Sequence, residues 1–470
     1  MKRGIVGIFL FLIFFVSLAF AQETAQLNEI VGSAYLENHS YQVLERICDE
    51  AGGRLVGSPL NEKAQNILKE ELEKDGWQVK SEKFSIPGWV RGDDEVLMTA
   101  PARRRLQAVA LGYVGQTPAF EAPGVYAAYG FPEDYENVDA KDKIVLVTSE
   151  KPEGKEGLLR QEAIEIAADK GARAILFINT KPGGLNLAGT GDFQGNPTRI
   201  PAFSLTMEEG QWLQRLLENN IPVKLSMTVR SRNQPVETSN IVLTLPGKVK
   251  KKIVVGAHFD SWDLGQGGID NGLGTAILFD AARLMKKFSP QNYYTVEFVW
   301  FNGEELGLWG SKKYLEMHRG DDIAAMINMD MTGTPVGFNA MGFDELVPFL
   351  QNLEKQLPGF DLSRGVMNRP WTNSDNQPFM LEGIPTISLL GHLDDEMVKY
   401  YHTRADTYDK VNKEYLSDAT AVVTVLLKEL ANDEQLPLKN KNSDEVVEML
   451  KKYHLDKRLK HQKEWPFGNR

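Results

Sequence analysis

The sequence predicts an α/β protein in which helices cover both faces of a mostly parallel, mixed β-sheet, with a β-rich module inserted into it. From Thr238 to Leu430, strand-like and helix-like segments alternate, which is typical of a parallel sheet covered by helices. Residues 95–235 instead hold short strand candidates separated by proline and glycine, with one or two helices. The length of 470 residues is that of one very large domain or two to three ordinary ones.

The first 21 residues are a candidate signal peptide. Lys2 and Arg3 precede an apolar stretch, and residues 19–21, AFA, form a small-x-small cleavage site, so the mature chain is expected to begin at Gln22. The apolar stretch is short for a spanning helix, which needs about 20 apolar residues. We therefore expect a secreted or periplasmic protein with no membrane span after cleavage.

The spacing of apolar residues predicts the other elements in order. Residues 24–75 are expected to be helical, up to Gly76, and residues 77–86 to form a strand. In the inserted module we expect strands at 143–148 and 174–178 and a helix at 162–170. The later strands are expected at 241–245, 253–257, 294–301, 324–329 and 384–390, and the later helices at 274–287, 304–314, 346–357 and 416–430. Residues 433–470 form a charged tail that is expected to attach loosely.

The composition is that of a globular protein and excludes some partners. The net charge of −11 argues against a nucleic-acid partner, because phosphate binding requires a basic face. The only cysteine, Cys48, cannot form an internal disulfide, and it falls on the apolar face of a predicted helix. We therefore expect Cys48 to be a core residue, with stability coming from packing or from metal.

Histidine and acidic residues fall where predicted strands end. In a parallel sheet these carboxyl ends meet at one edge, so the side chains that follow them are expected to converge there. The residues are His258, Asp270 in the glycine-rich loop 265–272, the pair Glu304-Glu305, Asp330 and His402.

These residue types suit a pair of zinc ions, since zinc binds imidazole nitrogen and carboxylate oxygen and a catalytic site keeps a position for water. Two ions about 3.5–4 Å apart need a bridging carboxylate and can share a hydroxide. Asp270 is the candidate bridge, because the glycines around it allow sharp turns of the backbone. Of the adjacent Glu304 and Glu305, one can bind metal while the other acts as the general base that takes a proton from water.

Asp260 lies two residues after His258, on the same side of an extended segment. Its carboxylate could accept the second imidazole N–H and so orient the histidine. The alternative is that Asp260 only caps a turn.

Six motifs, in order along the chain, carry a family resemblance. They are residues 255–263 (VGAHFDSWD), 268–272 (GIDNG), 301–307 (FNGEELG), 328–330 (NMD), 374–379 (SDNQPF) with 383–385 (GIP), and 401–407 (YHTRADT). They resemble the motifs of the co-catalytic two-zinc aminopeptidase family, and residues 260–267 look most like its plasma glutamate carboxypeptidase branch. The resemblance implies a zinc exopeptidase-like domain made of residues 22–94 and 236–432. Residues 95–235 are similar to the protease-associated domain often inserted in such enzymes.

The resemblance also implies a role for each matching residue. His258 and Asp330 hold one zinc, Glu305 and His402 hold the other, Asp270 bridges the two, Glu304 is the general base and Asp260 orients His258.

The substrate-binding residues are less closely defined by the resemblance. Many relatives have proline where this chain has Arg404, which could bind a substrate carboxylate through two N–H groups or could point to solvent. Tyr401, Ser374 and Asp375 lie within the motifs and are the other candidates for substrate contact.

The function implied is that of a secreted di-zinc exopeptidase. It would hydrolyse peptide bonds of small peptides or dipeptides through a metal-bridged hydroxide, and a homodimer is the default assembly. Two alternatives remain open at this point, a catalytically silent, receptor-like binding protein on the same scaffold and a glutaminyl cyclase. The sequence does not indicate which end of a peptide is recognised.

Overall fold

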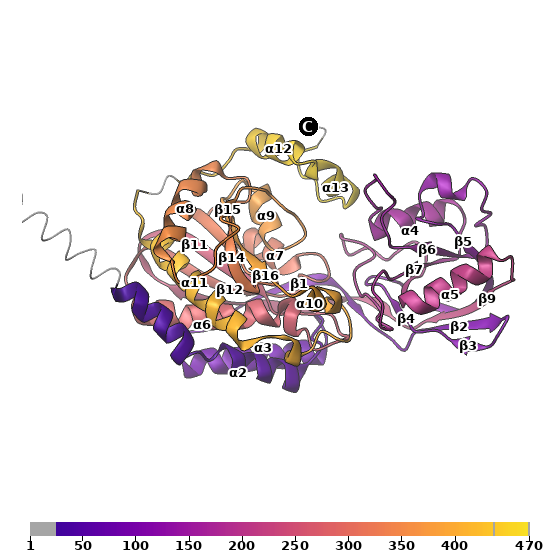
Figure 1. The fold of residues 1–470 in the computed structure, drawn as a ribbon, viewed down its shortest axis with the longest axis horizontal. Coiled ribbons are helices and arrows are strands. Elements are labelled where there is room, and N and C mark those ends of the chain that lie inside the picture. Colours follow the sequence, from indigo (N-terminus) through magenta and orange to yellow (C-terminus); the bar gives the residue numbers. More distant parts are fainter. Residues whose placement is uncertain (1–24, 436–437, 469–470) are drawn as a thin grey trace, which may run out of the picture.

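Two lobes lie side by side in the computed structural model, which describes residues 25–435 and 438–468 (Figure 1). The main lobe contains both ends of the described chain, and the smaller inserted lobe lies beyond the edge of its sheet (Figure 1). The candidate signal peptide, residues 1–21, lies outside the described residues. Within the described part, none of the helices combines the length and the apolar character needed to cross a membrane.

The main lobe begins with helices, as the apolar spacing predicts. Residues 25–36 are helical, followed by α2 (Ser40–Arg46) and the short π-helix η1 (Ile47–Ala51). The helix α3 (Pro59–Lys74) starts at an N-cap, Ser58, whose side chain accepts the N–H of Asn61 at 3.1 Å. Cys48 is buried and free, in agreement with the expected core position.

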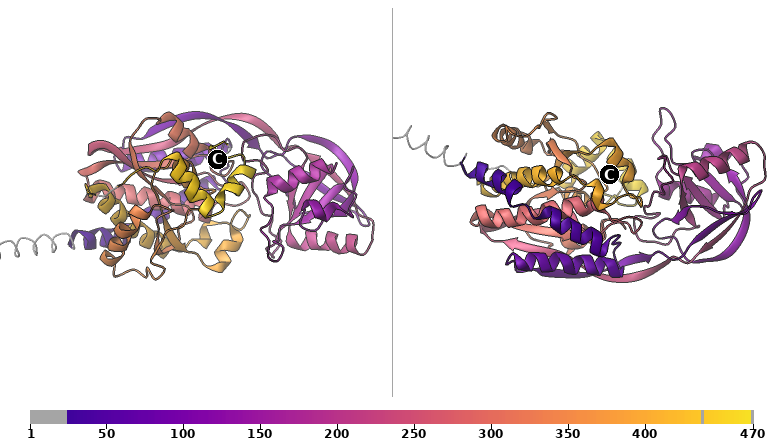
Figure 2. Two further views of the ribbon diagram at one scale, coloured as in Figure 1. Left: turned by 90° about the horizontal axis from the view of Figure 1, so that it is seen from above. Right: turned by 60° about the horizontal axis from the view of Figure 1, so that its bottom comes forward.

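Two long antiparallel strands connect the lobes (Figure 2). Strand β1 (Lys80–Val90) enters the inserted lobe and β10 (Arg232–Leu245) returns from it, paired from Lys80 opposite Val242 to Val90 opposite Arg232. Because β1 pairs with β10 along its whole length, the two strands form a continuous ribbon between the lobes.

The central sheet of the main lobe has eight strands in the order β1-β10-β12-β11-β13-β16-β14-β15. Its middle strands, β12, β11, β13 and β16, run parallel to one another. The bounds are β11 (Gly247–His258), β12 (Asn292–Phe301), β13 (Ile323–Asn328), β14 (Thr334–Asn339), β15 (Val366–Met367) and β16 (Thr386–His392). A mixed sheet with a parallel centre confirms the predicted fold class.

Helices cover both faces of this sheet. Successive strand residues alternate between two apolar clusters, with Val255 in the larger cluster and Val254 in the smaller one. The larger cluster packs against α6 (Leu273–Phe288) and α11 (Lys413–Asn432), and the smaller one against α7 (Trp309–Met317) and α9 (Asn376–Leu381). The helix α8 (Val347–Gln356) and the 3₁₀ turn η4 (Asp344–Leu346) complete the edge beside β15.

The helix predicted to begin at Glu304 begins five residues later, so that boundary was wrong. Gly303 (φ 86°), Gly307 (φ 126°) and Leu308 (φ 60°) adopt left-handed conformations that interrupt a helix. Glu304 and Glu305 therefore occupy a turn between β12 and α7, in which their side chains are not restricted to helical spacing.

The inserted lobe is rich in β-strands, as expected from its sequence. Its sheet has the order β3-β2-β9-β5-β6-β7-β8-β4 and is flanked by α4 (Arg160–Asp169) and α5 (Met207–Glu218). The strands are β2 (Glu95–Ala100), β3 (Arg104–Arg105), β4 (Ala108–Ala110), β5 (Thr117–Tyr126), β6 (Ile144–Thr148), β7 (Ala174–Ile178), β8 (Ala202–Leu205) and β9 (Lys224–Val229).

The charged tail does not attach loosely, and that expectation was wrong. It forms α12 (Ser443–Lys452) and α13 (Leu455–His461), which lie over the main lobe and reach toward the inserted one (Figure 1). Val446, Leu450 and Leu459 are buried in the main core, because α12 is amphipathic despite its high charge.

Candidate metal centre

Five predicted ligands converge at the carboxyl end of the parallel strands. His258 is the last residue of β11, and Glu305 and Asp330 follow β12 and β13 within a few residues. Asp270 lies in η3 (Gly268–Gly272), directly before α6, and His402 follows α10 (Asp395–Tyr400). Parallel neighbours end at the same edge of the sheet, which is why loops far apart in the sequence meet here.

Asp270 lies at the centre of this cage. Its Oδ1 is 3.3 Å from His258 Nε2, and its Oδ2 is 2.9 Å from His402 Nε2. Each histidine has a second carboxylate, because His258 Nε2 is 3.6 Å from Asp330 Oδ1 and His402 Nε2 is 3.0 Å from Glu305 Oε2. The cage therefore consists of two three-residue groups that share Asp270, each able to converge on one ion.

The donor atoms of the cage fit zinc. Buried oxygens Glu305 Oε1 and Asp330 Oδ1 have no hydrogen-bond partner among the described residues, although buried carboxylate oxygens are normally paired. Two imidazole nitrogens and three carboxylates are ligands that zinc takes. A cation at each three-residue group would satisfy both of these oxygens.

The charges of the cage are strongly coupled. Burial opposes protonation of His402, but the carboxylates of Glu305 and Asp270 outweigh it and raise the pKa of His402 to about 10. Burial raises the pKa of Glu305 to about 7 against the opposing charge of His402. Although burial favours its neutral form, the two histidines hold the pKa of Asp270 far below its usual value. Three carboxylates face two imidazoles, an imbalance that bound cations would neutralise.

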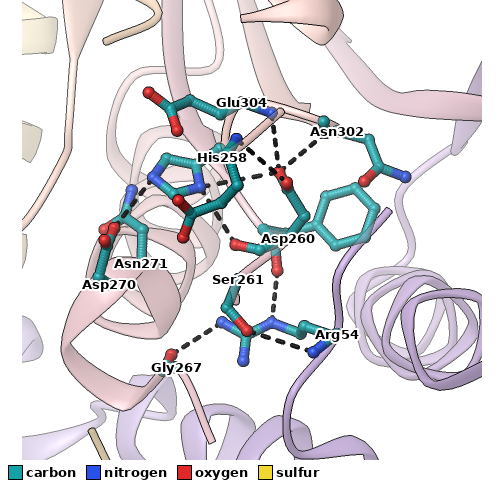
Figure 3. A network of polar contacts seen from close by, with 12 residues as sticks. Arg54, His258, Asp260, Ser261, Gly267, Asp270, Asn271, Asn302 and Glu304 are labelled. Atoms are coloured by element: carbon teal, nitrogen blue, oxygen red, sulfur yellow. Dashed lines mark hydrogen bonds and ion pairs between the residues drawn. The ribbon is translucent and has the colours of Figure 1, made fainter. Parts of the chain in front are cut away.

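Glu304 and Glu305 are held by the carboxylate of Asp260. Asp260 Oδ1 accepts the N–H groups of Gly303 at 2.8 Å and Glu304 at 3.1 Å, and its Oδ2 accepts that of Glu305 at 3.4 Å (Figure 3). Asp260 is fully buried. A carboxylate that accepts several N–H groups fixes the backbone of this turn, and with it the direction of both glutamate side chains.

The contact between Asp260 and His258 differs from the expected one. His258 Nδ1 lies 3.1 Å from the backbone carbonyl of Asp260, whereas the carboxylate Oδ1 is 3.7 Å away. The carbonyl can accept the Nδ1 proton and leave Nε2 directed at the cage. Asp260 thus orients His258 through its backbone, while its side chain holds the glutamate turn.

Two buried positioning residues were not identified from the sequence. The guanidinium of Arg54 donates to the carbonyls of Phe259, of Gln266 at 2.6 Å and of Gly267 at 2.9 Å, which links both ends of the loop before Asp270 (Figure 3). No pattern near Arg54 indicates this contact.

Asp406 is the second of these residues. Its carboxylate accepts the N–H groups of Ile269 at 2.6 Å and Asp270 at 3.0 Å, and it is buried. Burial raises the pKa of Asp406 to about 7 in spite of these two hydrogen bonds. Asp406 belongs to the same motif as His402, and this was the signal that could have identified it.

Ser374 and Asp375 are both buried in the structure. Ser374 Oγ donates to Asp330 Oδ2 at 2.7 Å and is itself buried, so it orients a cage carboxylate. Asp375 is fully buried, and burial raises its pKa to about 7. Substrate contact by these two residues stays a prediction, whereas the contact of Ser374 with Asp330 is part of the structure.

Tyr401 and Arg404 lie where the two lobes meet. The Tyr401 ring stacks on the His402 ring, with centroids 3.7 Å apart. Burial raises the pKa of the Tyr401 hydroxyl far above its usual value, and the cage carboxylates act in the same direction. Arg404 is exposed, and one of its N–H groups donates to the carbonyl of Gly184 in the inserted lobe at 3.0 Å.

The inserted lobe contacts the cage directly. The N–H of Ala188 donates to the carbonyl of His402 at 2.9 Å, and the Tyr113 hydroxyl donates to the carbonyl of Leu306 at 2.8 Å. Trp262 of the main lobe packs into the apolar core of the inserted lobe and meets the His402 ring edge-on, with centroids 6.0 Å apart. The inserted lobe therefore supports the loops that carry the ligands.

Known families and proteins match this arrangement. Residues 240–427 match the model of peptidase family M28, and residues 109–213 match that of the PA domain. Carboxypeptidase Q of Mus musculus is 27% identical over 430 residues, which cover 88% of this chain and 90% of that protein. Aminopeptidase YwaD of Bacillus subtilis (strain 168) is 27% identical over 416 residues, 85% of this chain and 86% of that protein.

Solved structures share the fold over nearly the whole chain. A peptidase M28 precursor from Shewanella amazonensis SB2B has a TM-score of 0.76 at 24% identity, covering 89% of this chain and 99% of that chain. BSAP, a zinc aminopeptidase from Bacillus subtilis, has a TM-score of 0.69 at 23% identity, covering 86% and 98% of the two chains. The family resemblance of the six motifs is thereby confirmed: the chain is a metallopeptidase whose residues 240–427 match peptidase family M28 and whose inserted residues 109–213 match the PA domain.

Proposed function

We propose that this protein is an exported exopeptidase that uses two zinc ions to hydrolyse peptide bonds of small peptides. The observation that carries the proposal is the placement of Asp270 between His258 and His402, with one carboxylate oxygen toward each. A single-ion site has no need of a carboxylate shared between two complete ligand groups. Export rests on the candidate signal peptide, and its test is the N-terminal sequence of the mature protein.

Within this proposal, His258 and Asp330 would hold one ion, Glu305 and His402 the other, and Asp270 both. Zinc supplies Lewis acidity, which lowers the pKa of water and polarises the substrate carbonyl. The protein residues keep the ligands in place. Ser374 orients Asp330, and the Asp260 carbonyl directs His258.

Glu304 is the general base in this proposal. It is half-buried beside the cage, and burial raises its pKa well above the usual value, with further effects of Glu305 and Asp330 in the same direction. A raised pKa favours a carboxylate that accepts a proton from the attacking water and returns it to the leaving amine. Asp260 fixes the backbone N–H of Glu304, so the carboxylate is positioned before substrate binds.

The test is the substitution Glu304→Gln, which keeps the shape of the side chain but removes the base. We expect turnover of a short peptide to fall about 10²–10⁴-fold while zinc content, measured by mass spectrometry of the metal, stays at two per chain. The matched control is Glu316→Gln, an exposed glutamate that pairs with Lys313 on α7, with unchanged activity expected. Undiminished turnover in zinc-loaded Glu304→Gln protein would contradict the assignment.

The named relatives include both a carboxypeptidase and an aminopeptidase, so product analysis is needed to assign the direction of cleavage. Peptides blocked at the amino end by acetylation, or at the carboxyl end by amidation, separate the two activities. The same preparation, analysed by sedimentation, tests the homodimer that is the default for a soluble oligomer.

A further inference from the structure

The charged tail joins the two lobes just after α13. Glu464 pairs through its Oε1 with Lys312 Nζ of the main lobe at 2.7 Å. The same oxygen accepts the side-chain amide of Gln194, which belongs to the inserted lobe, and Gln194 Nε2 also donates to the carbonyl of Gln462 at 3.3 Å. These four residues, which we call the tail junction, lie where α13 reaches toward the inserted lobe (Figure 1).

The tail junction is charged and largely buried. The Glu464 side chain is 8% exposed, and Gln462 is buried completely. Leu459 of α13 anchors this part of the tail in the main core. Farther out, His461 Nδ1 lies 2.7 Å from Glu162 Oε1 of α4. Hydrogen bonds to a shielded, ionised carboxylate are stronger than those of an exposed ion pair, so Glu464 is the residue on which the junction chiefly depends.

The tail junction lies beside the Asp330 side of the metal centre. Gln462 is hydrogen-bonded to the side-chain amide of Asn373, with Gln462 Nε2 2.9 Å from that group. The next residue, Ser374, donates its hydroxyl to Asp330 Oδ2 at 2.7 Å. Only two adjacent residues therefore separate the tail from a proposed zinc ligand.

On the opposite side of the centre, the inserted lobe contacts the main lobe directly. The N–H of Ala188 donates to the carbonyl of His402 at 2.9 Å. The covalent connections of the inserted lobe, β1 and β10, leave from one edge of the central sheet. Contacts between the lobes thus border the metal centre on its His402 side and, through the tail, on its Asp330 side.

We propose that the charged tail, held by Glu464, closes the Asp330 side of the space between the lobes and so limits the length of the peptide that reaches the metal centre. The inference rests on the proposed peptidase function and adds the size class of its substrate. An extended residue spans about 3.3–3.6 Å, so only a few residues of a peptide fit between a scissile bond at the centre and the tail. A longer peptide binds only while the tail junction is open, and its apparent affinity is reduced by the fraction of open molecules.

The experiment compares kcat/KM for Ala-Ala and for hexa-alanine in wild type and in Glu464→Ala. Wild type is expected to prefer Ala-Ala. Because Glu464→Ala removes the bonds to both lobes, this preference should fall about tenfold or more, with kcat/KM for Ala-Ala unchanged. Glu464→Gln, which keeps an oxygen for Gln194 but loses the charge, should lie between the two. Glu448→Ala, at an exposed glutamate of α12, is the control and should keep the wild-type preference.

A second variant separates the tail junction from the packing of the tail. Gln194→Ala removes only the partner in the inserted lobe, and it leaves the pair of Glu464 with Lys312 in place. This variant should also lower the preference for Ala-Ala. Equal kcat/KM for the two peptides in wild type, or an unchanged preference in either variant, would overturn the proposal.

Holding the tail junction shut tests the opposite direction. Cysteines introduced by His461→Cys and Glu162→Cys can be joined by a short bismaleimide, since the native side chains meet at 2.7 Å, and the natural Cys48 is buried. The cross-linked protein should cleave Ala-Ala as before and hexa-alanine more slowly than the same protein without the cross-link. Cleavage of hexa-alanine that is unaffected by the cross-link would contradict closure by the tail.

A binding measurement keeps the test independent of turnover. Zinc-loaded Glu304→Gln protein is titrated with hexa-alanine, with and without the added substitution Gln194→Ala. The added substitution should increase the affinity for hexa-alanine and leave that for Ala-Ala unchanged. Equal affinity for hexa-alanine would overturn the proposal even if wild type is an active peptidase. An increased affinity in a protein whose wild type cleaves neither peptide would support closure by the tail while refuting the proposed function.

Discussion

The carboxylate of Asp260 accepts the backbone N–H of Glu304 at 3.1 Å, although the two residues are separated by 44 positions in the chain. The same carboxylate accepts the N–H of Gly303, and its second oxygen accepts that of Glu305. Because Asp260 is also joined to His258 through its carbonyl, one buried residue connects a proposed metal ligand with the proposed general base.

Substituting Asp260 by asparagine should therefore impair catalysis without removing a metal ligand. Asn has the same shape but only one acceptor atom, so the N–H groups of the glutamate turn lose their ionised partner. We expect kcat to fall about 10–100-fold, which is typical of residues that orient metal ligands. Steady-state kinetics with zinc analysis would measure this. Asp263→Asn, which weakens the partly buried ion pair with Arg91, is the control, and equal effects of both substitutions would refute the role.

The shared position of Asp270 predicts distinct zinc contents for two variants. His402→Ala removes a ligand of one group only, so about one zinc per chain should remain, whereas Asp270→Ala should reduce both. Metal analysis after dialysis tests this directly. His392→Ala, at an exposed histidine, should keep two ions. Loss of both ions in His402→Ala, or retention of both in Asp270→Ala, would be inconsistent with a bridge.

Arg54 should contribute strongly to stability. Lysine in its place has a single ammonium group and cannot donate to all of the backbone carbonyls that the guanidinium bonds. Each buried acceptor left without a donor costs about 1–3 kcal/mol. We expect Arg54→Lys to lower the free energy of unfolding by about 3 kcal/mol or more, measured by urea denaturation. The exposed Arg103→Lys should change it by about 0.5 kcal/mol or less. A loss in Arg54→Lys as small as in this control would show that the loop does not depend on the guanidinium.

A second network, remote from the metal centre, predicts a pH dependence of stability. Burial disfavours the charged form of His318, but its bonds to Glu82 and Asp321 outweigh this and raise its pKa, with Lys252 and Tyr314 as its other close neighbours. Since the folded pKa lies above the ordinary value of 6.5, the stabilisation is complete below about pH 6.5 and is lost as the pH rises through the folded pKa.

Thermal unfolding between pH 5.5 and 9 tests this linkage. The difference in Tm between wild type and His318→Gln should be largest near pH 6 and should shrink toward pH 9. Replacing the exposed His392 by glutamine should leave the profile unchanged. A difference in Tm that grows with pH would mean that His318 is neutral in the folded protein.

Much of the fold and the side chains of the candidate metal centre could be predicted, because each depends on residue type at short range. Apolar runs such as residues 253–257 predict strands in any context, and polar residues directly after them must lie at the sheet edge. The helix at Glu304 was misplaced because three left-handed residues stop it, and left-handed backbone at Leu308 has no local signature.

The sequence by itself determined the parallel sheet, the inserted β-rich module and the five side chains that meet at one edge. Only the tertiary structure decided which atoms contact which. The carboxylate of Asp260 accepts backbone N–H groups, Arg54 donates to backbone carbonyls, and the charged tail packs Val446 and Leu450 into the main core. Backbone donors and acceptors are the same for nearly every residue, so their directions, and hence their partners, exist only once the distant segments have packed.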